Sequence, residues 1–130
     1  MAPTSRNTIL LIDDNADLRD SLSTMLRAEG FSVTAVGSGP EGLDATAREA
    51  FDLILLDMLM PDQDGISTYQ DLRGNPVTRK TPVILFTGLA VEGHWEAMPQ
   101  EGDGPCYVMG KPYDMSLLLA RISQLLSQPG

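Results

Sequence analysis

The chain has 130 residues, which is the usual size of one domain, and 42% of them are hydrophobic. With 12 glycines, 9 prolines and 21% charged residues, the composition excludes collagen-like, low-complexity and coiled-coil classes. Acidic residues outnumber basic ones by 18 to 9, and the net charge of −9 argues against direct binding to nucleic acid or to an anionic membrane.

The first half of the chain alternates predicted strands and helices. The unbroken apolar run Ile9–Ile12 is typical of a strand that is covered on both faces, as in a parallel sheet. Apolar residues at helical spacing begin at Leu18, and the helix is expected to stop at Gly30. A weaker strand candidate, Phe31–Val36, precedes a second helix with Pro40 in its first turn. The predicted apolar stripe of that second helix consists of three residues: Leu43, Ala47 and Ala50.

The second half continues the alternation. Three further apolar runs predict strands: Leu53–Leu56, Val83–Phe86 and, more weakly, Cys106–Met109. A short helix is expected over 66–73, and a last helix is expected after the capping residue Asp114. Segment 88–105 contains four glycines and two prolines, so a short or irregular fourth helix is expected there.

Strands and helices that alternate in this way predict an α/β fold. The arrangement is a doubly wound parallel sheet with right-handed crossovers. The sequence contains no internal repeat and no linker, so residues 1–130 are interpreted as a single domain with its core over 7–127.

Ionisable and hydroxyl side chains stand where the predicted strands end. They are Asp13, Asp14, Asp57, Thr87 and Lys111. In a parallel sheet, the carboxyl ends of all strands lie at one edge, where ligands bind. Each residue alone could be a helix cap or a strand terminator, but the joint pattern favours one shared site.

Three carboxylates that lie close together repel one another unless one is protonated or a divalent cation neutralises them. Carboxylate oxygens favour Mg²⁺, which often shares its coordination with phosphate oxygens. The acidic cluster, Thr87 and Lys111 therefore suit a phosphoryl group bound covalently to an aspartate. The expected nucleophile is Asp57, which stands alone at the tip of the central strand.

With these features, the sequence resembles a receiver domain of the two-component response regulator family, similar to the single-domain chemotaxis regulators. The resemblance covers residues 7–127, and four motifs carry it: ILLIDDN, LILLDMLMPDQDG, VILFTG and GKPYD. It implies a five-stranded parallel sheet in the flavodoxin-like order 2-1-3-4-5. It also implies a phosphorylation-dependent switch and no enzymatic activity beyond self-phosphorylation and self-dephosphorylation.

The same resemblance implies roles for individual residues. Asp57 would accept a phosphoryl group from a histidine kinase or a histidine phosphotransferase. The implied Mg²⁺ ligands are Asp14, Asp57 and the backbone carbonyl of Leu59, with Asp13 acting through water. Lys111 would pair with the phosphoryl oxygens, and Thr87 would form a hydrogen bond to the same group. The modified chain would then bind a downstream protein or a separate output domain differently.

One departure from the family pattern concerns the output. The family usually has an aromatic residue three positions before the lysine, where this chain has Val108, while Tyr107 lies one position further back. Either a bulge re-aims Tyr107 or the aromatic part of the switch is missing. Segment 88–105 is also expected to lack the regular fourth helix that forms part of the partner-binding surface in the family.

Other functions are weaker alternatives. A pseudo-receiver would act as an interaction module without phosphorylation, but the acidic and lysine positions are complete. A Mg²⁺-dependent phosphohydrolase of the haloacid dehalogenase type needs a second aspartate at position 59, where this chain has Leu59. The lone Cys106 is expected to be a small, buried and unreactive residue. The presence of only one cysteine and the absence of a long apolar N-terminal stretch predict a cytoplasmic protein.

Overall fold

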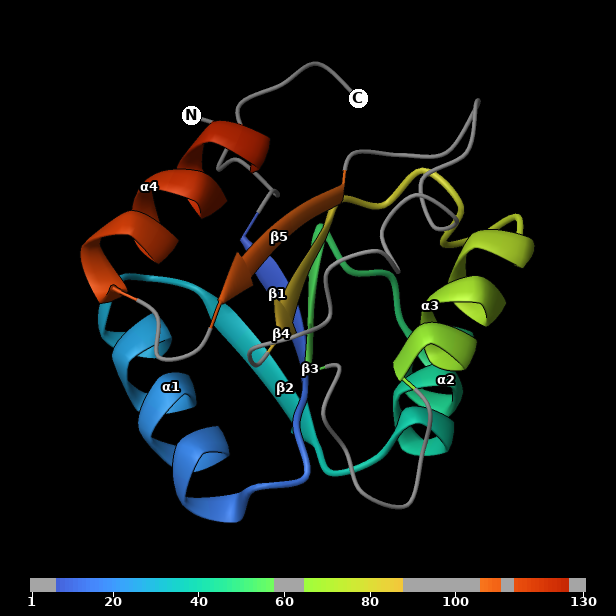
Figure 1. The fold of residues 1–130 in the computed structure, drawn as a ribbon, viewed down its shortest axis with the longest axis horizontal. Coiled ribbons are helices and arrows are strands. Elements are labelled where there is room, and N and C mark those ends of the chain that lie inside the picture. Colours follow the sequence, from blue (N-terminus) through green and yellow to red (C-terminus); the bar gives the residue numbers. More distant parts are fainter. Residues whose placement is uncertain (1–6, 58–64, 88–105, 111–113, 127–130) are drawn as a thin grey trace.

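The computed structural model describes residues 7–57, 65–87, 106–110 and 114–126 (Figure 1). In chain order the elements are β1 (Thr8–Ile12), α1 (Ala16–Ala28), β2 (Ser32–Val36), α2 (Gly39–Arg48), β3 (Leu53–Asp57), α3 (Gly65–Gly74), β4 (Val83–Thr87), β5 (Cys106–Gly110) and α4 (Met115–Leu126). The strands form one parallel sheet in the order β2-β1-β3-β4-β5. The predicted fold and strand order are confirmed, while the segment 88–105 lies outside the described residues.

Helices cover both faces of the sheet. In Figure 1, α1 and α4 lie on one side and α2 and α3 on the other. Strand residues alternate between two hydrophobic clusters, and Ile9 and Leu11 pack on the α1 and α4 side while Leu10 and Ile12 pack on the α2 and α3 side. This two-sided burial explains why the strands read as unbroken apolar runs. Within the described ranges, no helix combines the length and the hydrophobicity needed to cross a membrane.

Helix α1 begins two residues after Asp14 and has a capping signal at each end, and its stop at Gly30 is as predicted. The Asn15 side chain is the N-cap and accepts a hydrogen bond of 3.0 Å from the Leu18 N–H. At the other end, Gly30 has a φ of 99°, and the Phe31 N–H donates to the Leu26 carbonyl at 3.1 Å. The position of the first helix relative to the end of β1 is therefore fixed locally.

The predicted apolar stripe of α2 is wrong. Leu43 is only half-buried, and Ala47 and Ala50 are exposed. The buried face instead consists of small residues: Gly39, Gly42, Ala45 and Thr46. A Cβ atom on Gly42 would lie 2.4 Å from Cδ1 of Ile12, so α2 packs against β1 at a distance that excludes larger side chains. Glycine and threonine carry no hydrophobic signal, which is why the periodicity pointed to the wrong face.

A buried arginine organises the connection between α3 and β4. Arg73 is only 7% exposed, and its Nη1 donates to the carbonyls of Thr78 at 3.2 Å, Arg79 at 2.8 Å and Thr81 at 2.7 Å. Its Nε donates to the Tyr69 hydroxyl oxygen at 3.1 Å. The planar guanidinium thus satisfies several groups at once and holds the chain that leads into β4.

Tyr69 makes the stability of this region sensitive to alkaline pH. Burial raises the pKa of its hydroxyl above the ordinary value, although the hydrogen bond from Arg73 acts in the opposite direction. The folded state therefore holds this proton more tightly, so stability is retained below about pH 10 and falls above it, where the unfolded chain ionises first. Urea unfolding should show a steeper loss of stability between about pH 9 and pH 11 for the wild type than for Tyr69→Phe. Equal slopes would contradict this assignment.

Candidate metal centre

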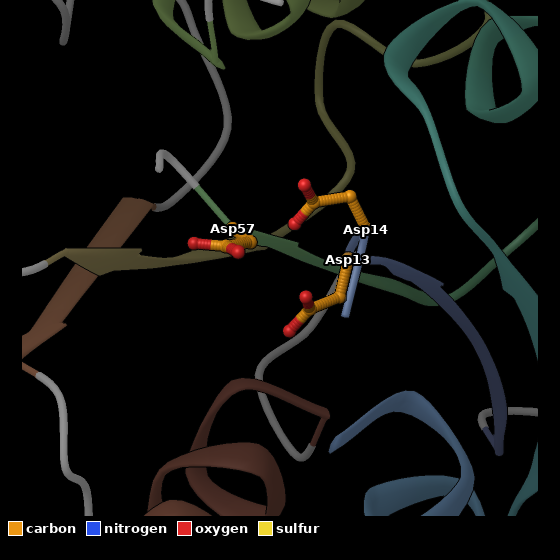
Figure 2. A group of neighbouring side chains, drawn as sticks. All are labelled: Asp13, Asp14 and Asp57. Carbon is orange, nitrogen blue, oxygen red and sulfur yellow. The ribbon is translucent and has the colours of Figure 1, made fainter. Parts of the chain in front are cut away.

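Three carboxylates meet at the carboxyl ends of β1 and β3. Asp57 is the last residue of β3, and Asp13 and Asp14 follow the last residue of β1. Each side chain offers one oxygen, and these oxygens lie within 4.8 Å of one another. Figure 2 shows the Asp13 and Asp14 side chains leaving the end of β1 in different directions, with Asp57 beside them at the end of β3. The sequence-based prediction that these three acids lie together is confirmed.

The three carboxylates differ in their access to solvent. Asp13 is 1% exposed and Asp57 is 2% exposed, whereas Asp14 is exposed. Buried carboxylates at such distances repel one another, and a cation that binds between them relieves the repulsion. Three hard oxygen donors, one of them open to solvent, match the ligand preference of Mg²⁺, which retains water molecules when it binds. The residues present therefore fit this ion.

Backbone hydrogen bonds hold Asp13 in place. Its N–H donates to the Val36 carbonyl at the end of β2 at 3.1 Å, and its Oδ1 accepts from the Asn15 N–H at 2.9 Å. Its own carbonyl accepts a hydrogen bond of 2.8 Å from Nη1 of Arg19 in α1. Sequence reasoning did not find Arg19, because a contact to a backbone carbonyl leaves no complementary side chain to recognise.

Of the other predicted site residues, Thr87, Lys111 and Leu59, the structure describes only the backbone of Thr87. Thr87 is the last residue of β4, and its backbone pairs in register with Gly110 at the end of β5. Its strand position is as predicted, but its side chain is not among those described. Lys111, which follows Gly110 in sequence, and Leu59, which follows Asp57 by two positions, lie outside the described residues.

The position of Tyr107 resolves one alternative left by the sequence. Strands β4 and β5 pair one to one from Cys106 to Gly110, so no bulge re-aims Tyr107. Its ring packs with the cluster on the α1 and α4 side of the sheet, and the Arg121 guanidinium lies 4.3 Å from the ring centroid. Cys106 is half-buried rather than buried, and it packs against the opposite cluster.

Comparison with known proteins agrees with this geometry. The family model described as the response regulator receiver domain matches residues 9–123. The chain therefore belongs to the response regulator receiver domain family, whose members are phosphoacceptor signalling modules of two-component systems.

Two curated relatives show how the chain compares with longer proteins. It is 37% identical to the transcriptional activator protein PfeR of Pseudomonas aeruginosa over 118 residues. That alignment covers 91% of this chain and 37% of PfeR. The chain is 36% identical to the response regulator PleD of Caulobacter vibrioides over 118 residues. This second alignment covers 90% of this chain and 25% of PleD. The chain thus spans between a quarter and two fifths of these relatives.

Solved structures support the fold and the type of site. The receiver domain of the sensor histidine kinase PA1611 from Pseudomonas aeruginosa has a TM-score of 0.81 and 28% identity, over 95% of this chain and 100% of that one. That structure has a magnesium ion coordinated in its active-site cleft. The chemotaxis protein CheY4 of Vibrio cholerae has a TM-score of 0.81 over 93% of this chain and 99% of that one, and its 21% identity supports the fold alone.

Proposed function

We propose that this chain is a phosphorylation-dependent signalling switch in which Asp57 accepts a phosphoryl group. The observation that carries the proposal is the buried Asp57 carboxylate at the end of the central strand, with Asp13 and Asp14 within 4.8 Å. Family membership supports a histidine kinase or a histidine phosphotransferase as the donor. Residues 7–127 would act as one receiver domain, and the switch would operate in the cytoplasm.

In the proposed reaction, an Asp57 carboxylate oxygen attacks the phosphorus of a phosphohistidine. A P–O bond forms as the P–N bond breaks, and the bonding electrons return to the imidazole, which takes up a proton. The proposed Mg²⁺ ligands are Asp13 through water, Asp14, Asp57 and the Leu59 carbonyl, and the bound ion would offset the negative charge of the acids and the phosphoryl group. Lys111 and Thr87 would contact the phosphoryl oxygens.

The output would be a shift between two conformations. Phosphorylation adds a group with close to two negative charges, and only contacts that differ between the conformations can shift their populations. We assign those contacts to Thr87, the last residue of β4, and to Lys111, which follows β5 in sequence. The favoured conformation would bind a downstream protein or an output domain with altered affinity.

A metal-dependence experiment tests the proposal. With acetyl phosphate and Mg²⁺, the intact mass is expected to rise by about 80 Da, the mass of one phosphoryl group, with acetate as the leaving group. With EDTA the mass should stay unchanged, and excess Mg²⁺ should restore the increase, because the acidic cluster cannot accept more negative charge without a cation. An unchanged mass in the presence of Mg²⁺, or an equal increase in EDTA, would contradict the proposal.

A further inference from the structure

Arg19 connects helix α1 to the acidic end of β1. It lies in the first turns of α1 and is half-buried, and its Nη1 donates to the Asp13 carbonyl at 2.8 Å. Within the helix, its own N–H donates to the Asn15 carbonyl at 2.9 Å, so the backbone from which the side chain extends is ordered by the helix cap. The Arg19 side chain therefore starts from the ordered backbone of α1, and its guanidinium is hydrogen-bonded to the chain that follows β1.

The carbonyl that Arg19 contacts belongs to the peptide between the two adjacent acids. Because a peptide unit is planar, fixing the direction of this carbonyl also fixes the plane that joins the Cα atoms of Asp13 and Asp14. The Asp13 N–H is already bonded to the Val36 carbonyl at 3.1 Å, so Arg19 supplies the restraint on the other side of the residue. The relative direction of the two side chains, which diverge in Figure 2, depends on this plane.

The chain after β2 leaves room for this contact. A Cβ atom on Gly37 would lie 3.0 Å from Nη1 of Arg19, which is tighter than nine in ten real Cβ contacts. The guanidinium thus passes over a residue that has no side chain, directly after the strand whose last carbonyl binds Asp13. A methyl group at position 37 would require the guanidinium to shift by a few tenths of an ångström, which strains its contact with the Asp13 carbonyl without changing any charge.

We propose that Arg19 is a positioning residue for the acidic site: it orients the Asp13 and Asp14 carboxylates for a shared Mg²⁺ by holding the peptide between them. The inference rests on the proposed function, because it concerns the same cation. When Arg19 is replaced, this positioning role and a simple charge effect predict changes of opposite sign in Mg²⁺ affinity. Removing a positive charge near carboxylates strengthens cation binding, whereas losing their orientation weakens it.

Calorimetric titration of the full chain with MgCl₂ separates these two effects. Arg19→Gln is expected to weaken Mg²⁺ binding by about tenfold, the size seen when groups that orient metal ligands are removed. The matched control is Arg27→Gln, because Arg27 is on the same helix and donates to the Val33 carbonyl of β2 at 2.9 Å. Both variants lose one charge and one bond to a carbonyl, and Arg27→Gln should bind Mg²⁺ as the wild type does.

A second variant and a metal-free measurement make the test independent of folding defects. Gly37→Ala should weaken Mg²⁺ binding in the same direction but by a smaller factor, and it should add little in the Arg19→Gln background because both changes act on the same contact. In metal-free protein, NMR should show shifts of the Asp13 carbonyl carbon and the Asp14 amide in Arg19→Gln but not in Arg27→Gln.

Equal or tighter Mg²⁺ binding by Arg19→Gln, relative to Arg27→Gln, would overturn the positioning role. Unchanged metal-free signals of the Asp13–Asp14 peptide in Arg19→Gln would also overturn it. A wild type that binds no Mg²⁺ would contradict the proposed function instead, and the metal-free NMR comparison would then decide the positioning role alone.

Discussion

The Asp57→Asn variant is expected to gain no mass from acetyl phosphate and Mg²⁺ under conditions in which the wild type gains about 80 Da. Asparagine has nearly the same size and shape, so it should fit the buried position at the end of β3, where Asp57 is 2% exposed. Its amide is a poor nucleophile and carries no negative charge for a cation to balance. Phosphorylation should therefore be abolished rather than slowed, as measured by intact mass and by a phosphate-retarding gel.

The matched control for this experiment is Asp44→Asn. Asp44 lies on α2, its side chain is 67% exposed, and it pairs with Arg48 at 3.0 Å. Its removal changes the net charge by the same amount as the Asp57 substitution but leaves the acidic cluster intact. The control should gain mass like the wild type. A mass increase in Asp57→Asn equal to that of Asp44→Asn would show that the phosphoryl group is attached elsewhere.

Replacing Arg73 by methionine should cause a large loss of stability. The substitution keeps most of the side-chain volume but removes the donor for three backbone carbonyls and for the Tyr69 hydroxyl. Buried polar groups that lose their partner cost about 1–3 kcal/mol each, and some of these carbonyls can recover water. We expect the free energy of unfolding to fall by about 3–5 kcal/mol, a large share of the stability of a domain this size.

Urea unfolding of Arg73→Met beside Arg48→Met checks this expectation. Arg48 is on the surface of α2 with a side chain that is 68% exposed, and its ion pair with Asp44 is fully accessible to salt and water. Such pairs contribute about 0.5 kcal/mol or less, so Arg48→Met should unfold almost like the wild type. Similar midpoints for the two variants would show that Arg73 does not organise the connection between α3 and β4.

Much of the fold could be predicted from the sequence, because burial on both faces leaves a simple signature in each strand. The unbroken run Leu53–Leu56 and the helix stop at Gly30 each indicate one structure and agree with their neighbours. The contact face of α2 could not be predicted in this way. Close packing of Gly42 on Ile12 depends on the absence of a side chain, and hydrophobic periodicity does not register an absence.

The acidic site could be predicted because it depends only on chain order and on the geometry of parallel sheets. Asp13, Asp14 and Asp57 follow strands that the sequence identifies clearly, and neighbouring strand ends lie together. Arg19 could not be found from sequence, since its partner is a peptide carbonyl that every residue possesses. The side of the sheet occupied by Tyr107 needed the register of β5 with β4, which short apolar runs do not define.

Mg²⁺-dependent thermal unfolding tests the central claim, that three carboxylates share one cation, most directly. At ten times its dissociation constant, Mg²⁺ should stabilise the wild type by about 1.4 kcal/mol and raise Tm by about 5 °C relative to NaCl of equal ionic strength. The shift should nearly vanish in Asp14→Asn and Asp57→Asn but persist in Asp44→Asn. An equal shift in all four proteins, or none in the wild type, would contradict the account.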